Sequence, residues 1–116
     1  MQETDPNGVD QHAPGAKLDA GKPSMSLLQD FGMALRAVAE VGTYGAAKYT
    51  RGGWQHVDDG MRRYSDAMMR HYFAERYSDV DTDSGLLHAA QTAWNALARL
   101  EIALRAGVYH QPTSKI

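Results

Sequence analysis

Apolar residues recur at three- and four-residue steps in three stretches of the chain, the spacing of one face of an α-helix. In the first stretch, from about residue 26 to residue 49, the apolar stripe consists of Phe31, Leu35, Val38, Gly42 and Gly45. The opposite face is also mostly apolar, with Met33, Ala37, Tyr44 and Ala47 around Glu40. We therefore expect this helix to be covered on two sides and Glu40 to lie among nonpolar neighbours.

Two more helices are predicted, over about 58–77 and 85–106. Asp58 and Asp59 suit the start of the first of these, and Gly107 suits the C-terminal cap of the second. Their expected apolar stripes are Met61, Tyr64, Met68 and Tyr72, and then Leu86, Ala90, Ala93, Leu97, Leu100 and Leu104. Away from the last stripe lie His88, Gln91, Asn95 and Arg99. This polar line suits either contacts to a phosphate or base or a solvated helix face.

No stretch shows the alternating pattern of a strand, so the fold class predicted is all-α: a small bundle of three main helices, with room for a short extra one near the N-terminus. Residues 1–16 contain two prolines and two glycines without apolar periodicity, which predicts a flexible tail before a single domain over 17–116. Three amphipathic helices make a thin core. We therefore expect a homo-oligomer, a dimer or tetramer, that covers the second face of the first helix.

Composition narrows the function classes. With 116 residues, 43% hydrophobic and 22% charged, the chain fits one globular domain. The absence of cysteine excludes disulfides and thiolate zinc sites. A net charge of −2 argues against duplex nucleic acid as a partner. No apolar run approaches the roughly 20 residues of a membrane span, and no signal peptide is evident, so we expect a cytoplasmic protein.

Several residues are candidates for chemistry, each with a plain structural alternative. Glu40 on an apolar helix would need a cation or hydrogen bonds if buried, but a solvent-facing position would also explain it. Asp66 and Arg70 stand four residues apart, as in an ordinary surface ion pair. The acidic segment 78–85 lacks the glycine and glutamate of an EF-hand. No histidine is followed by aspartate, which speaks against HD-type phosphohydrolases, and Pro23 excludes a P-loop.

An ordered series of short motifs resembles a known family. The motifs are Lys17-Leu18-Asp19-Ala20-Gly21-Lys22-Pro23, Tyr44-Gly45-Ala46-Ala47-Lys48-Tyr49, Trp54, Arg70-His71, Asp79-Val80-Asp81, Ser84-Gly85, His88 and Asn95-Ala96-Leu97. Over roughly residues 16–100 the chain is similar to the MazZ-type phage dATP/dGTP diphosphohydrolases, a branch of the MazG-like all-α nucleotide pyrophosphohydrolases.

The resemblance implies cleavage of a purine deoxynucleoside triphosphate between its α and β phosphates, giving the monophosphate and pyrophosphate with Mg²⁺ or Mn²⁺. In some phages such enzymes serve the replacement of adenine by 2-aminoadenine in DNA. MazG-like enzymes bind metal through Glu-x-x-Glu and Glu-x-x-Asp. Here Thr43 and Arg63 stand where two of those carboxylates are expected, which leaves Glu40 and Asp66. Asp79, Asp81 and then His71 are candidates for the missing ligands.

The resulting hypothesis gives each candidate residue a role. Glu40 and Asp66, helped by Asp79 and Asp81, would hold the metal that activates a water. Charge on the triphosphate would be neutralised by the cations Lys48, Arg70, Lys17 and Lys22. Asp19 belongs to the same substrate-binding segment as Lys17 and Lys22. His88 and Asn95 would orient phosphate or sugar, and Trp54 would stack on the purine.

Two other classes of function remain open on the sequence. The first is a nucleotide-binding module without catalysis, which the two missing carboxylates favour. The second is a helical interaction protein in which Glu40 and the polar line beginning at His88 are interface or solvent positions. Nucleotide- and metal-dependent stability separates these classes, because a ligand that binds the native state raises its stability.

Overall fold

The computed structural model describes residues 3–109, and these form two compact units, Met1–Asp30 and Phe31–Ile116. This division falls later in the chain than the predicted boundary after residue 16, which stays a prediction.

The first unit is a series of turns organised around one carboxylate. Asp5 accepts backbone N–H groups from Lys17 (2.7 Å), Asn7 (2.7 Å) and Val9 (3.5 Å). The hydrogen bond from Lys17, followed by that from Asn7, lowers the pKa of Asp5 below its ordinary value. The expected tail thus forms turns that include a long-range hydrogen bond. A 3₁₀ helix, η1 (Met25–Phe31), follows as the short extra helix expected near the N-terminus.

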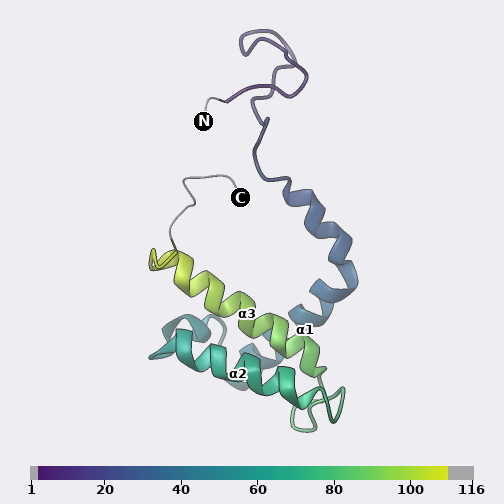
Figure 1. Cartoon of the computed structure of the whole chain (residues 1–116), viewed down its shortest axis with the longest axis vertical. Helices are drawn as coiled ribbons and strands as arrows, with labels where there is room; N and C mark the ends of the chain where they lie inside the picture. Colours follow the sequence, from purple (N-terminus) through teal and green to yellow (C-terminus); the bar gives the residue numbers. More distant parts are fainter. Residues whose placement is uncertain (1–2, 110–116) are drawn as a thin grey trace. The chain divides into compact units, whose positions relative to one another are not determined.

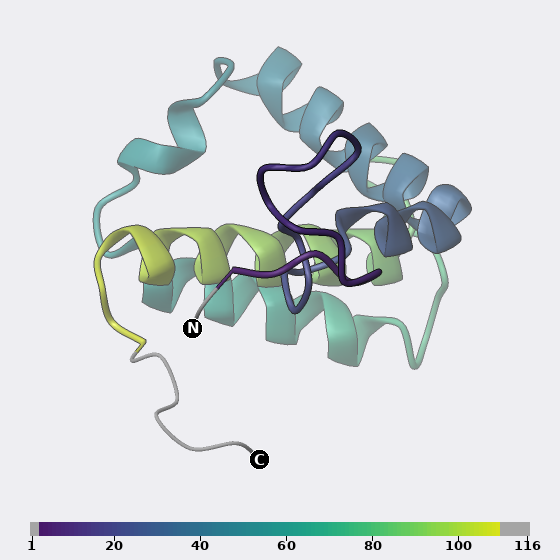
Figure 2. The same cartoon turned by 90° about the horizontal axis from the view of Figure 1, so that it is seen from above.

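The second unit consists of three α-helices, as predicted. They are α1 (Gly32–Lys48), α2 (Gly60–Ala74) and α3 (His88–Arg105), with a 3₁₀ turn η2 (Gly53–His56) between α1 and α2. Helices α2 and α3 lie side by side and run in opposite directions (Figure 1, Figure 2). Residues 3–109 contain no strand, only an isolated antiparallel bridge between Val80 and Leu87. Over the same residues, no helix combines the length and apolarity needed to cross a membrane.

The helix ends follow local chemistry. Gly107 adopts φ 70°, and the N–H groups of Gly107 and Val108 donate to Leu104 and Ala103, which is a Schellman cap. The predicted C-terminal signal is therefore confirmed. Asp59 does occupy the N-cap position of α2, but its side chain makes no cap hydrogen bond. Its carboxylate binds Arg62 Nε at 2.6 Å instead.

The predicted core face of α3 is wrong at its three leucines and is confirmed at Ala90. The buried residues of α3 are Ala90, Ala98 and Ala103 together with the polar His88, Gln91 and Asn95. The predicted core residues Leu97, Leu100 and Leu104 are 43–52% exposed. Small alanines let helices approach closely, and polar side chains tolerate burial once they are hydrogen-bonded. These three residues of the polar line therefore face inward. The sequence alone had left open whether the line is buried or solvated.

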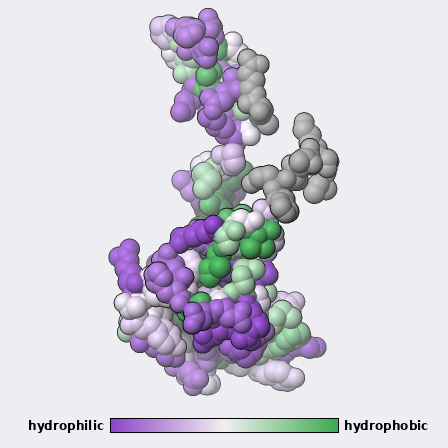
Figure 3. Space-filling model, turned by 90° about the vertical axis from the view of Figure 1, so that its left-hand side faces the viewer, coloured by the Kyte–Doolittle hydropathy of each residue, from purple (hydrophilic) through white to green (hydrophobic). Residues whose placement is uncertain are grey.

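Helix α1 contains no buried residue within the chain. Its contact with α3 includes Gly42, where an added Cβ would lie 3.3 Å from Trp94 Nε1. Met33 on the same helix is 91% exposed. The expectation that Glu40 lies among nonpolar neighbours is wrong in the single chain, since Glu40 is exposed and its carboxylate lies 3.7 Å from Arg36 Nε. Figure 3 shows hydrophobic side chains at the surface beside strongly hydrophilic ones.

Candidate active site

A groove of about 1230 Å³ lies between α1, the segment that contains η2, and helices α2 and α3. Five of the described residues that line it are cationic: Lys48, Arg51, Arg62, Arg63 and Arg70. Asp66 is the one carboxylate among these lining residues. Such an excess of positive charge in a concave site favours an anionic ligand, and several cations in one groove suit a chain of phosphates.

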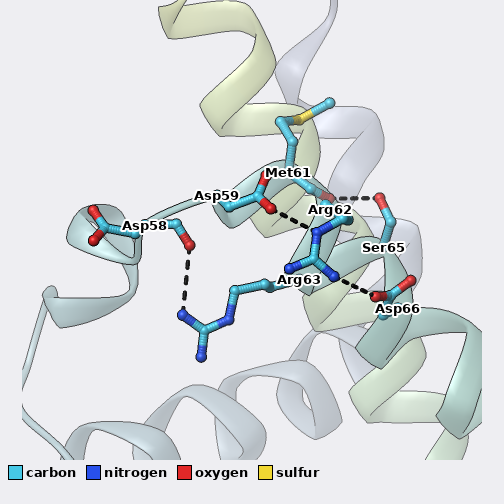
Figure 4. Close-up of polar contacts among 7 residues, drawn as sticks. All are labelled: Asp58, Asp59, Met61, Arg62, Arg63, Ser65 and Asp66. Carbon is cyan, nitrogen blue, oxygen red and sulfur yellow. Dashed lines mark hydrogen bonds and ion pairs between the residues drawn. The ribbon is translucent and has the colours of Figure 1, made fainter.

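The charged network at the start of α2 engages only some of these cations (Figure 4). Arg62 bridges two carboxylates, with Nε 2.6 Å from Asp59 Oδ2 and Nη1 3.2 Å from Asp66 Oδ2. Arg63 donates to the carbonyl oxygen of Asp58 at 3.5 Å. Within residues 3–109, no ion pair engages four of the groove cations, so their charge is uncompensated: Lys48, Arg51, Arg63 and Arg70.

Aromatic side chains form another part of the groove wall. Trp94 makes edge-on contacts with Trp54 and Tyr64, with ring centroids 6.0 Å and 5.8 Å apart. Tyr64 Oη donates to the Trp54 carbonyl at 2.7 Å, and the Arg105 guanidinium lies 5.7 Å from the Trp54 ring centroid. Trp54 is therefore a packed anchor of its loop as well as a lining residue. Tyr49, which is 76% exposed, offers a more accessible ring.

Lys48 lies close to the rings of Tyr49 and Tyr44. Its Nζ lies 5.2 Å from the ring centroid of Tyr49 and 5.9 Å from that of Tyr44. A hydrogen bond with Tyr49, reinforced by the charge interactions with Tyr49 and Tyr44, raises the pKa of Lys48 above its ordinary value. The ammonium group is thus held in its charged form beside the groove.

A second cluster of polar groups forms where the end of α2, the acidic turn and the start of α3 meet. His71, Asp81 and His88 place one ligand-type atom each within 4.8 Å of one another, and they are the one such group of three among the described residues. The Nδ1 atoms of His71 and His88 are 2.9 Å apart. Burial, followed by the neighbouring His88, lowers the pKa of His71. The cluster therefore favours neutral imidazole at His71.

Hydrogen bonds fix the acidic turn against α3. The N–H of Asp81 donates to Leu86 O, and the N–H of His88 donates to Asp79 O, both at 2.9 Å. Gln91 Nε2 donates to Asp81 Oδ2 at 3.4 Å and to Ser84 Oγ at 3.2 Å. Burial alone would raise the pKa of Asp81. Hydrogen bonds from Asp83 and Gln91, with the two nearby histidines, outweigh burial and lower that pKa on balance.

Comparison with known proteins identifies the family. A model of the dATP/dGTP diphosphohydrolase N-terminal region matches residues 12–111, which is most of the chain. The chain belongs to this family. Searches of curated proteins and of solved structures found no significant match. The match to the dATP/dGTP diphosphohydrolase family agrees with the resemblance drawn from the ordered motifs.

In this member of the dATP/dGTP diphosphohydrolase family, five residues predicted for the site line the groove. They are Lys48, Trp54, Asp66, Arg70 and Asn95. The expected pair of Asp66 with Arg70 is wrong, because Asp66 pairs with Arg62. Glu40 does not line the groove, and neither Glu40 nor Asp66 belongs to a three-residue ligand cluster within residues 3–109. Their roles in binding metal stay predictions.

The remaining predicted residues lie elsewhere. Asp81 and His88 belong to the cluster with His71, whereas the side chain of Asp79 does not, and its carbonyl oxygen serves the turn instead. The substrate-binding segment, with Lys17, Asp19 and Lys22, lies in the first unit, where Lys22 Nζ is 3.2 Å from Glu3 Oε1. Its proposed contact with nucleotide stays a prediction.

The sequence did not point to three groove residues, Arg51, Arg62 and Arg63, as substrate-binding groups, and it gave Tyr49 and Gln91 no individual role. The arginines at 51, 62 and 63 bracket the short segment around η2, and this local excess of positive charge was the available signal. In the sequence, Arg63 was noted only because it stands where the family motif has a carboxylate. In the fold it instead adds positive charge to the groove.

Proposed function

We propose that the chain is a dATP/dGTP diphosphohydrolase that converts a purine deoxynucleoside triphosphate to the monophosphate and pyrophosphate. The observation that carries this proposal is the groove with five cations and one carboxylate, found in a chain of this family. Phosphoryl transfer requires mainly alignment of the reacting groups and neutralisation of charge, and this groove is built to supply both.

Three of the uncompensated cations have the most direct roles. Lys48, Arg51 and Arg70 bind the phosphate oxygens and stabilise the negative charge that grows on the departing pyrophosphate. Arginine suits this task because its planar guanidinium makes two parallel hydrogen bonds to a phosphate. Tyr49 or Trp54 contacts the purine, and Asn95 orients the sugar or a phosphate.

Asp66 is the groove residue suited to hold Mg²⁺ or Mn²⁺. Mg²⁺ in such sites is usually held by one or two carboxylates together with substrate phosphates, so a single carboxylate in the groove fits an ion that arrives with the triphosphate. When bound, such an ion neutralises phosphate charge and lowers the pKa of a coordinated water. For Asp66 to bind it, Arg62 would give up one of its two carboxylate partners. Glu40 and Asp79 remain proposed as further ligands.

Two wider features belong to the same proposal. The chain functions as a homo-oligomer, which is supported by the absence of buried residues on α1 and the exposure of Met33 and Leu35. Its cellular role is to shape a phage nucleotide pool for DNA that contains 2-aminoadenine, an extension that rests on the family resemblance alone.

The test is incubation of the full chain with dGTP, dATP, dCTP and dTTP in Mg²⁺ or Mn²⁺, with separation of mono- and diphosphates and assay of pyrophosphate against phosphate. We expect monophosphate and pyrophosphate from the purine nucleotides. If a nucleotide raises the melting temperature of the chain but is not hydrolysed, the chain is instead a nucleotide-binding module. Stability indifferent to nucleotide and metal would identify a helical interaction protein.

A further inference from the structure

Two imidazole rings and one carboxylate converge outside the cationic groove, on three different parts of the second unit. His71 comes from the last turn of α2, Asp81 from the acidic turn, and His88 from the first residue of α3. Seventeen positions separate the two histidines along the chain, yet their Nδ1 atoms are 2.9 Å apart. His71 and Asp81 are half-buried and His88 is buried.

We propose that His71, Asp81 and His88 form a binding site for one divalent transition-metal ion of the Zn²⁺ or Co²⁺ class. Two imidazoles and a carboxylate are a known ligand set for such ions, with a fourth position left for water or another ligand. Two nitrogens bound to Zn²⁺ in tetrahedral geometry lie about 3.3 Å apart, so only a small movement of the rings separates the observed cluster from a metal site. This inference does not rest on the proposed hydrolysis.

The surroundings hold the Asp81 carboxylate and the backbone of the turn in place before any ion binds. Gln91 donates to Asp81, and the backbone of the turn is hydrogen-bonded to the start of α3 through Asp81 and His88. Such outer contacts orient metal ligands and contribute strongly to affinity. The conformational freedom that the Asp81 side chain and the turn lose on binding is correspondingly small.

The ligand chemistry distinguishes this site from the groove. Imidazole nitrogen favours Zn²⁺, Co²⁺ and related ions, whereas Mg²⁺ and Ca²⁺ favour oxygen. The cluster should therefore select a transition metal in the presence of excess Mg²⁺. The three ligands come from α2, the turn and α3. A bound ion would therefore link these elements in the native state and raise the melting temperature of the chain.

The experiment is titration of the metal-free full chain with Co²⁺ and Zn²⁺, followed by calorimetry and by the visible absorption of bound Co²⁺. We expect one ion per chain, little competition from Mg²⁺, and affinity weaker by more than about 100-fold in His71→Asn and His88→Asn, since losing a ligand costs more than losing an outer contact. The matched controls His56→Asn, on the exposed histidine of η2, and Asp83→Asn, on the exposed aspartate of the turn, should bind as the wild type does.

Two results would overturn the site: a wild-type chain that binds neither ion, or His71→Asn and His88→Asn variants that bind as tightly as the controls. Should one variant fail to fold, ¹⁵N NMR of the histidine rings in the wild type decides the question. Zn²⁺ should shift the ring-nitrogen signals of His71 and His88 and leave that of His56 in place. Unchanged signals from His71 and His88 would mean that the two rings share only a hydrogen bond.

Discussion

The groove and the histidine cluster, both in the second unit, gather charged or ligating side chains in different ways. The groove presents long, mostly exposed cations, and its carboxylate, Asp66, is already paired with Arg62. The cluster uses shorter side chains that are half-buried or buried, on a turn fixed by backbone hydrogen bonds. Long exposed cations adapt to a ligand that brings its own charge, whereas short fixed ligands suit an ion of defined size. From this difference we expect the nucleotide to bind in the groove and a Zn²⁺ or Co²⁺ ion to bind at the cluster.

The largest expected effect comes from removing the carboxylate of the groove. Asp66→Asn should lower dGTP turnover by about 100- to 1000-fold, because the carboxylate proposed to hold the metal ion that neutralises the reacting phosphates is lost. Co²⁺ binding at the cluster should not change. Steady-state kinetics with Mg²⁺ measures the first effect, and Asp58→Asn, at an exposed aspartate of the neighbouring loop, is the control. Undiminished turnover in Asp66→Asn would remove Asp66 from the site.

Removing one uncompensated cation should act mainly on substrate binding. Arg70→Gln should raise the KM for dGTP by about 10- to 100-fold, the loss expected for a hydrogen bond between charged partners. Arg76→Gln, at an exposed arginine beyond α2, is the matched control. A KM that is equal in the two variants would show that the phosphates do not contact Arg70.

Gln91 sharpens the comparison because it lines the groove and also binds Asp81. Gln91→Leu should weaken Co²⁺ binding by about 10- to 100-fold, as expected for an outer contact to a ligand. Its effect on the KM for dGTP should be smaller. Calorimetry and kinetics on the same preparation give both values, with Gln55→Leu on η2 as the control. A larger effect on KM than on Co²⁺ affinity would contradict the separation of the two sites.

The smallest effect concerns a single hydrogen bond between α2 and α3. Arg99 Nε donates to Ser65 Oγ at 2.8 Å and joins α3 to α2. Ser65→Ala should lower the free energy of unfolding by about 1 kcal/mol, the typical contribution of one hydrogen bond. Urea denaturation measures the loss, and Ser26→Ala on η1 is the control. An equal stability of the two variants would show that this link contributes nothing.

Local patterns predicted much of the fold. The three-residue and four-residue steps located all three helices, and Gly107 marked the end of α3 because only a left-handed residue completes its cap. Periodicity failed to decide which face of α3 is buried. The inward turn of His88, Gln91 and Asn95 depends on hydrogen bonds and contacts with groups elsewhere in the chain, which no local pattern encodes.

The residues of the candidate site were also predicted only in part, because some of them are brought together by contacts between distant parts of the chain. Trp54 and Arg70 were selected as members of the ordered motifs, and both line the groove. The meeting of His71 with His88 could not be seen, because the acidic turn brings together two helix ends that are distant in sequence. Glu40 is exposed in the single chain, and the burial expected for it depends on the predicted homo-oligomer, which stays a prediction.

The most direct test of the account is a crystal structure with Mn²⁺ and a dGTP analogue whose α–β bridging oxygen is replaced by an imido group. The account predicts the triphosphate in the groove against Lys48 and Arg70, with one Mn²⁺ at Asp66. Anomalous scattering locates the ion directly. Nucleotide bound outside the groove, with no ion at Asp66, would contradict the account.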